Sequence, residues 1–154
     1  MNRIHKAVFW MVMLFSTVIN AAELSEQSVR TFVAEMDAAV KAKDVASIDR
    51  MIAPEFKFKL YSRLFGASDK IETDKDGFMK YTREGLNLAE YYKAKREFLN
   101  VSISGGKAIC TSDLVESMVQ RGVYISTITA ETFTIELVDG SLLYTSYEGR
   151  LRKK

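Results

Sequence analysis

Several residue types on which common active sites depend are nearly missing from this sequence of 154 residues. It contains one cysteine, one histidine and one proline. The single cysteine excludes a disulfide scaffold, and a content of 47% hydrophobic and 27% charged residues excludes a collagen-like or low-complexity chain. No apolar run reaches the roughly 18 residues that a membrane-spanning helix needs. The composition is therefore that of an ordinary globular protein of one domain.

The N-terminus has the three-part layout of a secretory signal peptide. Arg3 and Lys6 form a short basic start, residues 7–19 are apolar apart from Ser16 and Thr17, and small residues follow at positions 21 and 22. We therefore expect residues 1–21 to be a signal peptide that is removed, and residues 22–154 to form one secreted domain in the periplasm. No cysteine lies near the cleavage site to carry a lipid anchor, so we expect no membrane attachment after cleavage.

Removal of this segment changes which kinds of chemistry remain. Losing Arg3 and Lys6 reduces the 22 basic residues to 20, which equals the 20 acidic residues, so nothing in the charge balance suggests a nucleic-acid partner. His5 is lost as well, which excludes zinc sites built from histidine and cysteine, and histidine-dependent nucleophilic pairs. We expect no metal and no cofactor. Cys110 lies in an apolar alternation and is predicted to be a buried, inert thiol.

Apolar residues at helical spacing predict two helices at the start of the secreted domain. The first follows Ser25 and presents one apolar stripe. The second is shorter, is capped by Asp44, and is expected to end before Pro54, because a proline disfavours helix at the preceding residue. The two together predict a helical hairpin.

After these helices, apolar residues recur at every second position of the sequence. Residues 56–61 alternate between apolar and polar side chains, which predicts a strand with one dry face. Residues 68–76 are polar and are expected to form a loop, after which Thr73 or Asp74 can cap a third helix. Residues 74–77 (DKDG) also look like the start of a calcium loop, but the remaining ligands are missing, so we interpret them as a helix cap.

The rest of the sequence contains only strand patterns and tight turns. Runs 91–104, 107–120, 123–138 and 141–152 are separated by Gly105-Gly106, Arg121-Gly122 and Asp139-Gly140. Such two-residue turns between alternating runs are strong hairpin signals. We therefore expect four long strands in an antiparallel meander.

This order of elements, with the segments 36–44 (MDAAVKAKD), 48–56 (IDRMIAPEF) and 137–142 (LVDGSL), resembles the nuclear transport factor 2-like superfamily. The resemblance covers nearly all of the secreted domain. It implies an α+β, cone-shaped fold with N-terminal helices packed in a strongly curved antiparallel sheet, and a pocket, but no particular reaction. The tyrosine and aspartate that ketosteroid isomerase uses have no match among the apolar residues of the first helix and first strand.

Counting residues outward from the turns assigns one inner face of the sheet. From Asp139-Gly140, Glu131 falls opposite Glu148, and from Arg121-Gly122, Ser112 falls beside Glu131 with Glu116 on the same face. A like-charged cross-strand pair is destabilising unless something offsets it. The same count places a polar, threonine-rich set of residues on the outer face.

Two interpretations of the Glu131–Glu148 pair stay open. In the first, burial and repulsion keep one carboxyl protonated and leave the other ionised, as acid and base catalysis requires. In the second, a β-bulge turns one glutamate outward, or Arg96, Lys95 or Arg150 neutralises the pair.

The leading hypothesis is a secreted domain that binds a small apolar molecule in an apolar pocket. One alternative is a cofactor-independent isomerase, lyase or hydrolase with Glu131 and Glu148 as catalytic residues. Another is a protein-interaction module that forms a homodimer through the outer sheet face. The candidate pocket residues are Phe56, Phe58, Tyr81, Ser112, Glu116, Phe133 and Tyr144.

Overall fold

Three helices precede the long strands, each with a polar cap at its start. Residues 23–62 and 69–153 are described by the computed structural model, so the predicted signal peptide at 1–21 lies outside them. Helices α1 (Glu26–Lys41), α2 (Val45–Arg50) and α3 (Lys75–Leu88) begin after Ser25, Asp44 and Asp74. Each cap side chain accepts a hydrogen bond from a backbone N–H three residues ahead, which satisfies one of the donors exposed at a helix start. The predicted caps are confirmed, with Asp74 rather than Thr73 capping α3.

The described residues form seven strands. Their bounds are β1 (Ile52–Ser62), β2 (Asp69–Thr73), β3 (Tyr91–Arg96), β4 (Asn100–Ser104), β5 (Lys107–Gln120), β6 (Val123–Val138) and β7 (Ser141–Lys153).

Three local predictions need correction. Residues 69–73 are a strand and not a loop, because their backbone pairs with β1 at the sheet edge, where an apolar alternation is not required. The run 91–104 is two strands, β3 and β4, which pair with different parts of β5. Helix α2 ends at Arg50, so Pro54 does not end it. Pro54 lies exposed within β1, beside an irregular stretch of pairing with β7 where a missing N–H is tolerated.

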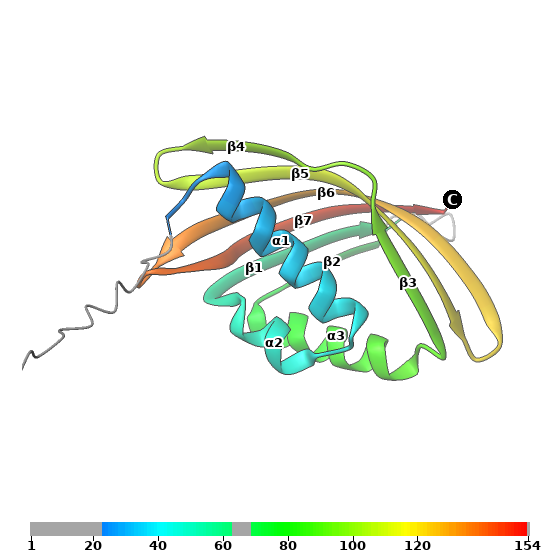
Figure 1. The fold of residues 1–154 in the computed structure, drawn as a ribbon. Coiled ribbons are helices and arrows are strands. Elements are labelled where there is room, and N and C mark those ends of the chain that lie inside the picture. Colours follow the sequence, from blue (N-terminus) through cyan, green and yellow to red (C-terminus); the bar gives the residue numbers. More distant parts are fainter. Residues whose placement is uncertain (1–22, 63–68, 154) are drawn as a thin grey trace, which may run out of the picture.

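The strands form one bent sheet that carries all three helices on one side (Figure 1). The strand order is β2-β1-β7-β6-β5-β3, and β4 pairs with β5 beside that path. All pairs are antiparallel except β1 with β7, which is parallel, so the sheet is mixed rather than wholly antiparallel. The strands β1 and β7 are distant in the sequence, and no hairpin turn sets their relative direction. The predicted α+β cone with its helices inside the curve is confirmed.

The hairpin turns have the geometry that their residues predict. Arg121, Gly122, Asp139 and Gly140 all have positive φ angles between 49° and 79°. Two successive positive φ angles define the hairpin turn whose twist matches that of the strands. The registers next to both turns, Gln120 with Val123 and Val138 with Ser141, are those obtained by counting.

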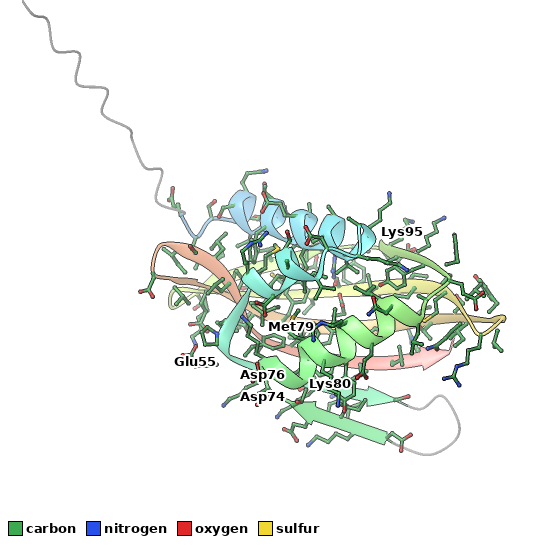
Figure 2. All side chains as sticks on the ribbon, turned by 90° about the horizontal axis from the view of Figure 1, so that it is seen from below. Glu55, Asp74, Asp76, Met79, Lys80 and Lys95 are labelled. Atoms are coloured by element: carbon green, nitrogen blue, oxygen red, sulfur yellow. The ribbon has the colours of Figure 1, made fainter. Side chains whose placement is uncertain are left out.

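The core lies between the helices and the concave face of the sheet. Val29 and Val33 of α1 are at most 1% exposed and pack with Phe133 and Ile135 of β6 in one buried cluster. Helix α3 contributes Met79, which is 5% exposed, whereas its neighbour Lys80 is solvent-exposed (Figure 2). Cys110 is fully buried, and burial raises the pKa of its thiol to about 11, as expected of an inert cysteine.

Candidate functional site

A cavity of about 480 Å³ lies between the helices and the concave face of the sheet. Residues of all three helices and of five strands line it, and most are hydrophobic. The cavity reaches the surface beside α3, where Tyr81 is 52% exposed and Gly85 is also exposed. Its described lining includes eight aromatic side chains: Phe56, Phe58, Phe78, Tyr81, Tyr92, Phe133, Tyr144 and Tyr147.

Most of the residues predicted to form a pocket do line this cavity. Phe56 and Phe58 come from β1, Tyr81 from α3, and Glu116, Phe133 and Tyr144 from the long strands. Ser112 is not part of the lining. It is 2% exposed and lies behind the surface of the cavity, where it contacts Glu131.

Arg96 is at the centre of a polar network in the cavity wall. Its Nε and Nη2 atoms donate to the two carboxylate oxygens of Asp37 at 3.1 and 2.8 Å. Its Nη1 atom contacts both Glu131 Oε2 and Ser112 Oγ. The guanidinium also lies over the Phe133 ring, 5.4 Å from its centroid. Two carboxylates from α1 and β6 thus share one cation from β3.

Glu131 is the most deeply buried carboxyl of the described residues, at 5% exposed. Besides Arg96, it accepts hydrogen bonds from Ser112 Oγ at 2.6 Å and from Tyr147 Oη at 2.9 Å. A buried charge is tolerated when a counter-ion and hydrogen bonds replace the water that it loses. Ser112 pairs with Glu131 across β5 and β6, as the sequence count predicts. The network therefore holds Glu131 in place as an ion-paired carboxylate.

The predicted Glu131–Glu148 pair is wrong. Ile135 pairs with Tyr144, but the preceding residue, Thr134, pairs with Ser146, so Thr145 is an extra residue on β7. This bulge reverses the face of every later residue in β7. Glu131 is therefore opposite Gly149.

The same bulge places Glu148 on the outer face. There it pairs with Thr132, its side chain is 42% exposed, and it lies 3.4 Å from Arg150. Tyr147 takes the inward position instead, although counting from Asp139-Gly140 without a bulge would put it on the outer face. The second of the two interpretations is the observed one: a bulge turns Glu148 outward and Arg96 neutralises Glu131.

A different carboxyl, that of Glu116, accompanies Glu131 in the cavity wall. Tyr92 Oη donates to its Oε1 atom at 2.5 Å, and no cation of the described residues lies within ion-pair distance of it. Burial raises the pKa of Glu116, and the negative charge of Glu131 raises it further, against the Tyr92 hydrogen bond and the charge of Arg96. The wall thus combines one ion-paired carboxylate with one carboxyl that keeps its proton to a higher pH than an exposed glutamate does.

Tyr144 brings an unsatisfied hydroxyl to the same region. The side chain is 5% exposed, and its ring packs between Phe32 and Phe133, with centroids 5.3 and 5.4 Å away. In the described part of the chain, its hydroxyl is the one buried side-chain polar atom without a hydrogen-bond partner. Burial raises the pKa of Tyr144 well above its usual value, so the phenol stays protonated. Such a group is uncommon in a folded protein and calls for an explanation.

Four residues of the network were missing from the predicted site residues: Asp37, Tyr92, Arg96, which was considered only as a neutralising cation, and Tyr147. For the first three the sequence contained a signal. Tyr92 and Arg96 alternate with exposed lysines in β3 and pair with Met118 and Leu114, which are inward positions of β5. Asp37 follows Met36 on the apolar stripe of α1.

The opposite face of the sheet has a different character. A hollow of about 450 Å³ there is lined by aliphatic, threonine and charged side chains, among them Lys107 and Glu136, which form an ion pair at 3.1 Å. No aromatic side chain of the described residues lines it. Within residues 23–62 and 69–153, no three His, Cys, Asp or Glu side chains are grouped to hold a metal ion. In the same ranges, no helix is both long and apolar enough to span a membrane.

Comparison with known proteins identifies the fold. No protein-family model and no curated protein matches the sequence. An NTF2-like protein of unknown function from Pseudomonas putida superposes with a TM-score of 0.64 at 12% identity, over 81% of this chain and 84% of that one. An NTF2-like protein from Cytophaga hutchinsonii gives 0.67 at 10% identity, over 84% and 100%.

A scytalone dehydratase-like protein from Novosphingobium aromaticivorans gives a TM-score of 0.64 at 12% identity, over 82% of this chain and 83% of that one. The helices inside a bent sheet thus define an α+β cone with a cavity. That cone is the nuclear transport factor 2-like fold, as the sequence resemblance indicated. This fold is compatible with a ligand-binding domain and with an acid/base enzyme.

Proposed function

We propose that this chain binds a small, largely apolar molecule in the cavity between its helices and its sheet. The observation that carries the proposal is the cavity itself. Its volume of about 480 Å³ lies in the range of small-molecule sites, roughly 300 to 1,000 Å³. Its wall is mostly hydrophobic and aromatic with a few polar groups at one place, which is the usual composition of such sites.

The test blocks the mouth of the cavity without touching the core. Gly85 lines the cavity on α3, and a Cβ atom added there meets nothing within 4 Å. Titration with the neutral fluorescent probe N-phenyl-1-naphthylamine is expected to show one saturable site in the wild type. Gly85→Trp is expected to weaken binding at least ~10-fold, or about 1.4 kcal/mol. The control Gly85→Ala is expected to bind like the wild type, and equal affinity in the Trp variant would refute the assignment of the site.

A second candidate, a cofactor-independent acid/base enzyme, is favoured by the two unlike carboxyls. Glu131 is ion-paired with Arg96, whereas no cation of the described residues lies within ion-pair distance of Glu116, whose pKa is raised. An acid and a base in one cavity need environments that differ in this way. Glu116 takes the place that the sequence analysis gave to Glu148.

The enzyme hypothesis is tested on whatever molecule co-purifies with the chain. Glu116→Gln is expected to abolish its turnover and to leave the circular dichroism spectrum unchanged. Glu148→Gln removes the same charge on the outer face and is expected to have no effect. Unchanged turnover in the Glu116 variant would leave binding as the function.

We also propose that the domain works after export to the periplasm and begins at Ala22. The basic start, apolar run and small residues of the first 22 positions support this. Intact-mass measurement on the periplasmic fraction is expected to give a chain that lacks residues 1–21. A chain that retains Met1 and stays in the cytoplasm would rule export out.

A further inference from the structure

The cavity wall contains more acidic than basic side chains. The described lining contains four charged side chains, of which Asp37, Glu116 and Glu131 are acidic and Arg96 is basic. The hydrogen bonds of Arg96 go to Asp37, Glu131 and Ser112, so its cation is already shared between two carboxylates. An anionic ligand would meet excess negative charge and a cation that is already paired with two carboxylates. The wall therefore disfavours an anion.

Glu116 keeps one carboxyl oxygen available. Tyr92 Oη donates to Oε1, and the described residues give Oε2 no hydrogen-bond or ion-pair partner. The other charged or titratable groups around it are Arg96 on β3, Glu131 on β6, Tyr147 on β7 and, across the cavity on α1, Asp37. Arg96 is already paired with the carboxylates of Asp37 and Glu131. A donor on a ligand can therefore approach Glu116 without displacing a protein group.

One further observation points to the same kind of ligand. The lining includes eight aromatic rings, and aromatic faces attract organic cations in water-poor sites.

We infer that the ligand is an apolar amine, whose ammonium group pairs with Glu116 and whose hydrocarbon body lies against the aromatic wall. This inference rests on the proposed function, since it names the chemical class that the cavity selects. The acidic wall discriminates against a carboxylate of the same shape, and Glu116 discriminates against an uncharged molecule of the same shape.

Three probes with one hydrocarbon body test this inference: 4-phenylbutylamine, 4-phenylbutan-1-ol and 5-phenylpentanoate. Calorimetric titration of the secreted domain at pH 8 is expected to rank them amine, alcohol, carboxylate, with the amine at least ~10-fold tighter than the alcohol. Glu116→Gln is expected to remove this advantage of the amine, so that the amine and the alcohol bind with similar affinity. Glu148→Gln, with the same loss of charge outside the cavity, is expected to keep the wild-type ranking.

A pH series adds a readout that hydrophobic binding alone would not change. The amine stays protonated between pH 5 and 8, whereas Glu116, with its raised pKa, gains a proton as the pH falls. As the pH is lowered from 8, the affinity for the amine is therefore expected to begin to fall above pH 4.5, the ordinary pKa of a glutamate, in the wild type, and to be flat in Glu116→Gln.

The failures of the two proposals can be told apart. Alcohol binding as tight as amine binding, or full amine affinity in Glu116→Gln, would overturn the amine assignment and leave a neutral apolar ligand. If none of the three probes binds, and the naphthylamine probe does not bind either, the proposed function fails together with the inference.

Discussion

Two tyrosines on β7 are in opposite situations although both line the cavity. The hydroxyl of Tyr147 donates to the buried carboxylate of Glu131 at 2.9 Å, whereas that of Tyr144 has no partner among the described residues. Removing a donor from a buried charge leaves that charge partly unsatisfied, at a cost of about 1–3 kcal/mol. Removing a hydroxyl that is itself unsatisfied removes a penalty instead.

We therefore expect Tyr147→Phe to lower the free energy of unfolding by about 1–3 kcal/mol, and Tyr144→Phe to leave it unchanged or raise it. Urea denaturation of the ligand-free chain of residues 22–154 measures both. Each variant serves as the control for the other, since the chemical change is identical. Equal losses in the two variants would show that Tyr144 has a hydrogen-bond partner in solution.

Glu116 gives the stability a dependence on pH. Its pKa is raised in the folded state by burial above the usual value of 4.5. As the pH rises past that value, the unfolded chain loses this proton before the folded chain does, so folding is progressively disfavoured until the folded group ionises too.

The free energy of unfolding of Glu116→Gln, relative to that of the wild type, is therefore expected to be higher at pH 8 than at pH 4. Denaturant unfolding at both pH values measures the difference, with Glu148→Gln as a control for the loss of a negative charge. A difference between variant and wild type that does not change with pH would contradict the assigned burial of this carboxyl.

At the scale of elements, the bulge in β7 decides which side chains enter the cavity. Turn residues predict the register beside each turn, and the Ser112–Glu131 pair on β5 and β6 was correctly predicted from Arg121-Gly122. The extra residue at Thr145 was not predictable by counting, because alternation on either side of a bulge looks regular in the sequence. Because this one extra residue was not detected, the count placed Glu148 in the site, where the structure has Tyr147.

The other differences have similar physical reasons. Strand β2 is polar and pairs at the sheet edge, so it lacked the alternation by which the other strands were found. The ion pair between Asp37 and Arg96 joins residues 59 positions apart, and only the packing of α1 against the sheet brings them together. The helices, with their caps and apolar stripes, depend on local signals and were predictable for that reason.

A Gly→Ala substitution is expected to have opposite effects on stability at two positions in different elements. A Cβ at Gly149 of β7 would lie 2.9 Å from atoms of Leu60, Thr129 and Tyr147, whereas one at Gly85 of α3 meets nothing within 4 Å. Gly149→Ala is expected to destabilise by about 1–3 kcal/mol through overpacking. Gly85→Ala is expected to stabilise by about 0.5–1 kcal/mol, because glycine is a poor helix former.

Thermal and urea denaturation of both alanine variants measure these changes. Because the Tyr147 ring is one of the crowded groups, the Gly149 variant is also expected to alter the tyrosine near-ultraviolet circular dichroism signal. A Gly149→Ala variant as stable as the wild type would show that this part of the wall is loosely packed.

At the scale of the whole molecule, the bent sheet and its three helices separate two surfaces of different chemistry (Figure 1). The concave side has a cavity with aromatic walls and a buried polar network. The convex side has a hollow lined by aliphatic, threonine and charged residues. The proposed function assigns ligand binding to the concave side alone, which makes the place of binding the central claim.

Backbone amide shifts during titration of the chain of residues 22–154 with 4-phenylbutylamine test that claim most directly. We predict saturable shifts at cavity positions such as Met118, Ile125 and Leu60, with Ile109 and Lys57 of the outer hollow unchanged. Saturable shifts confined to the outer hollow, or no saturable shift at any position with this probe or with its alcohol counterpart, would contradict it.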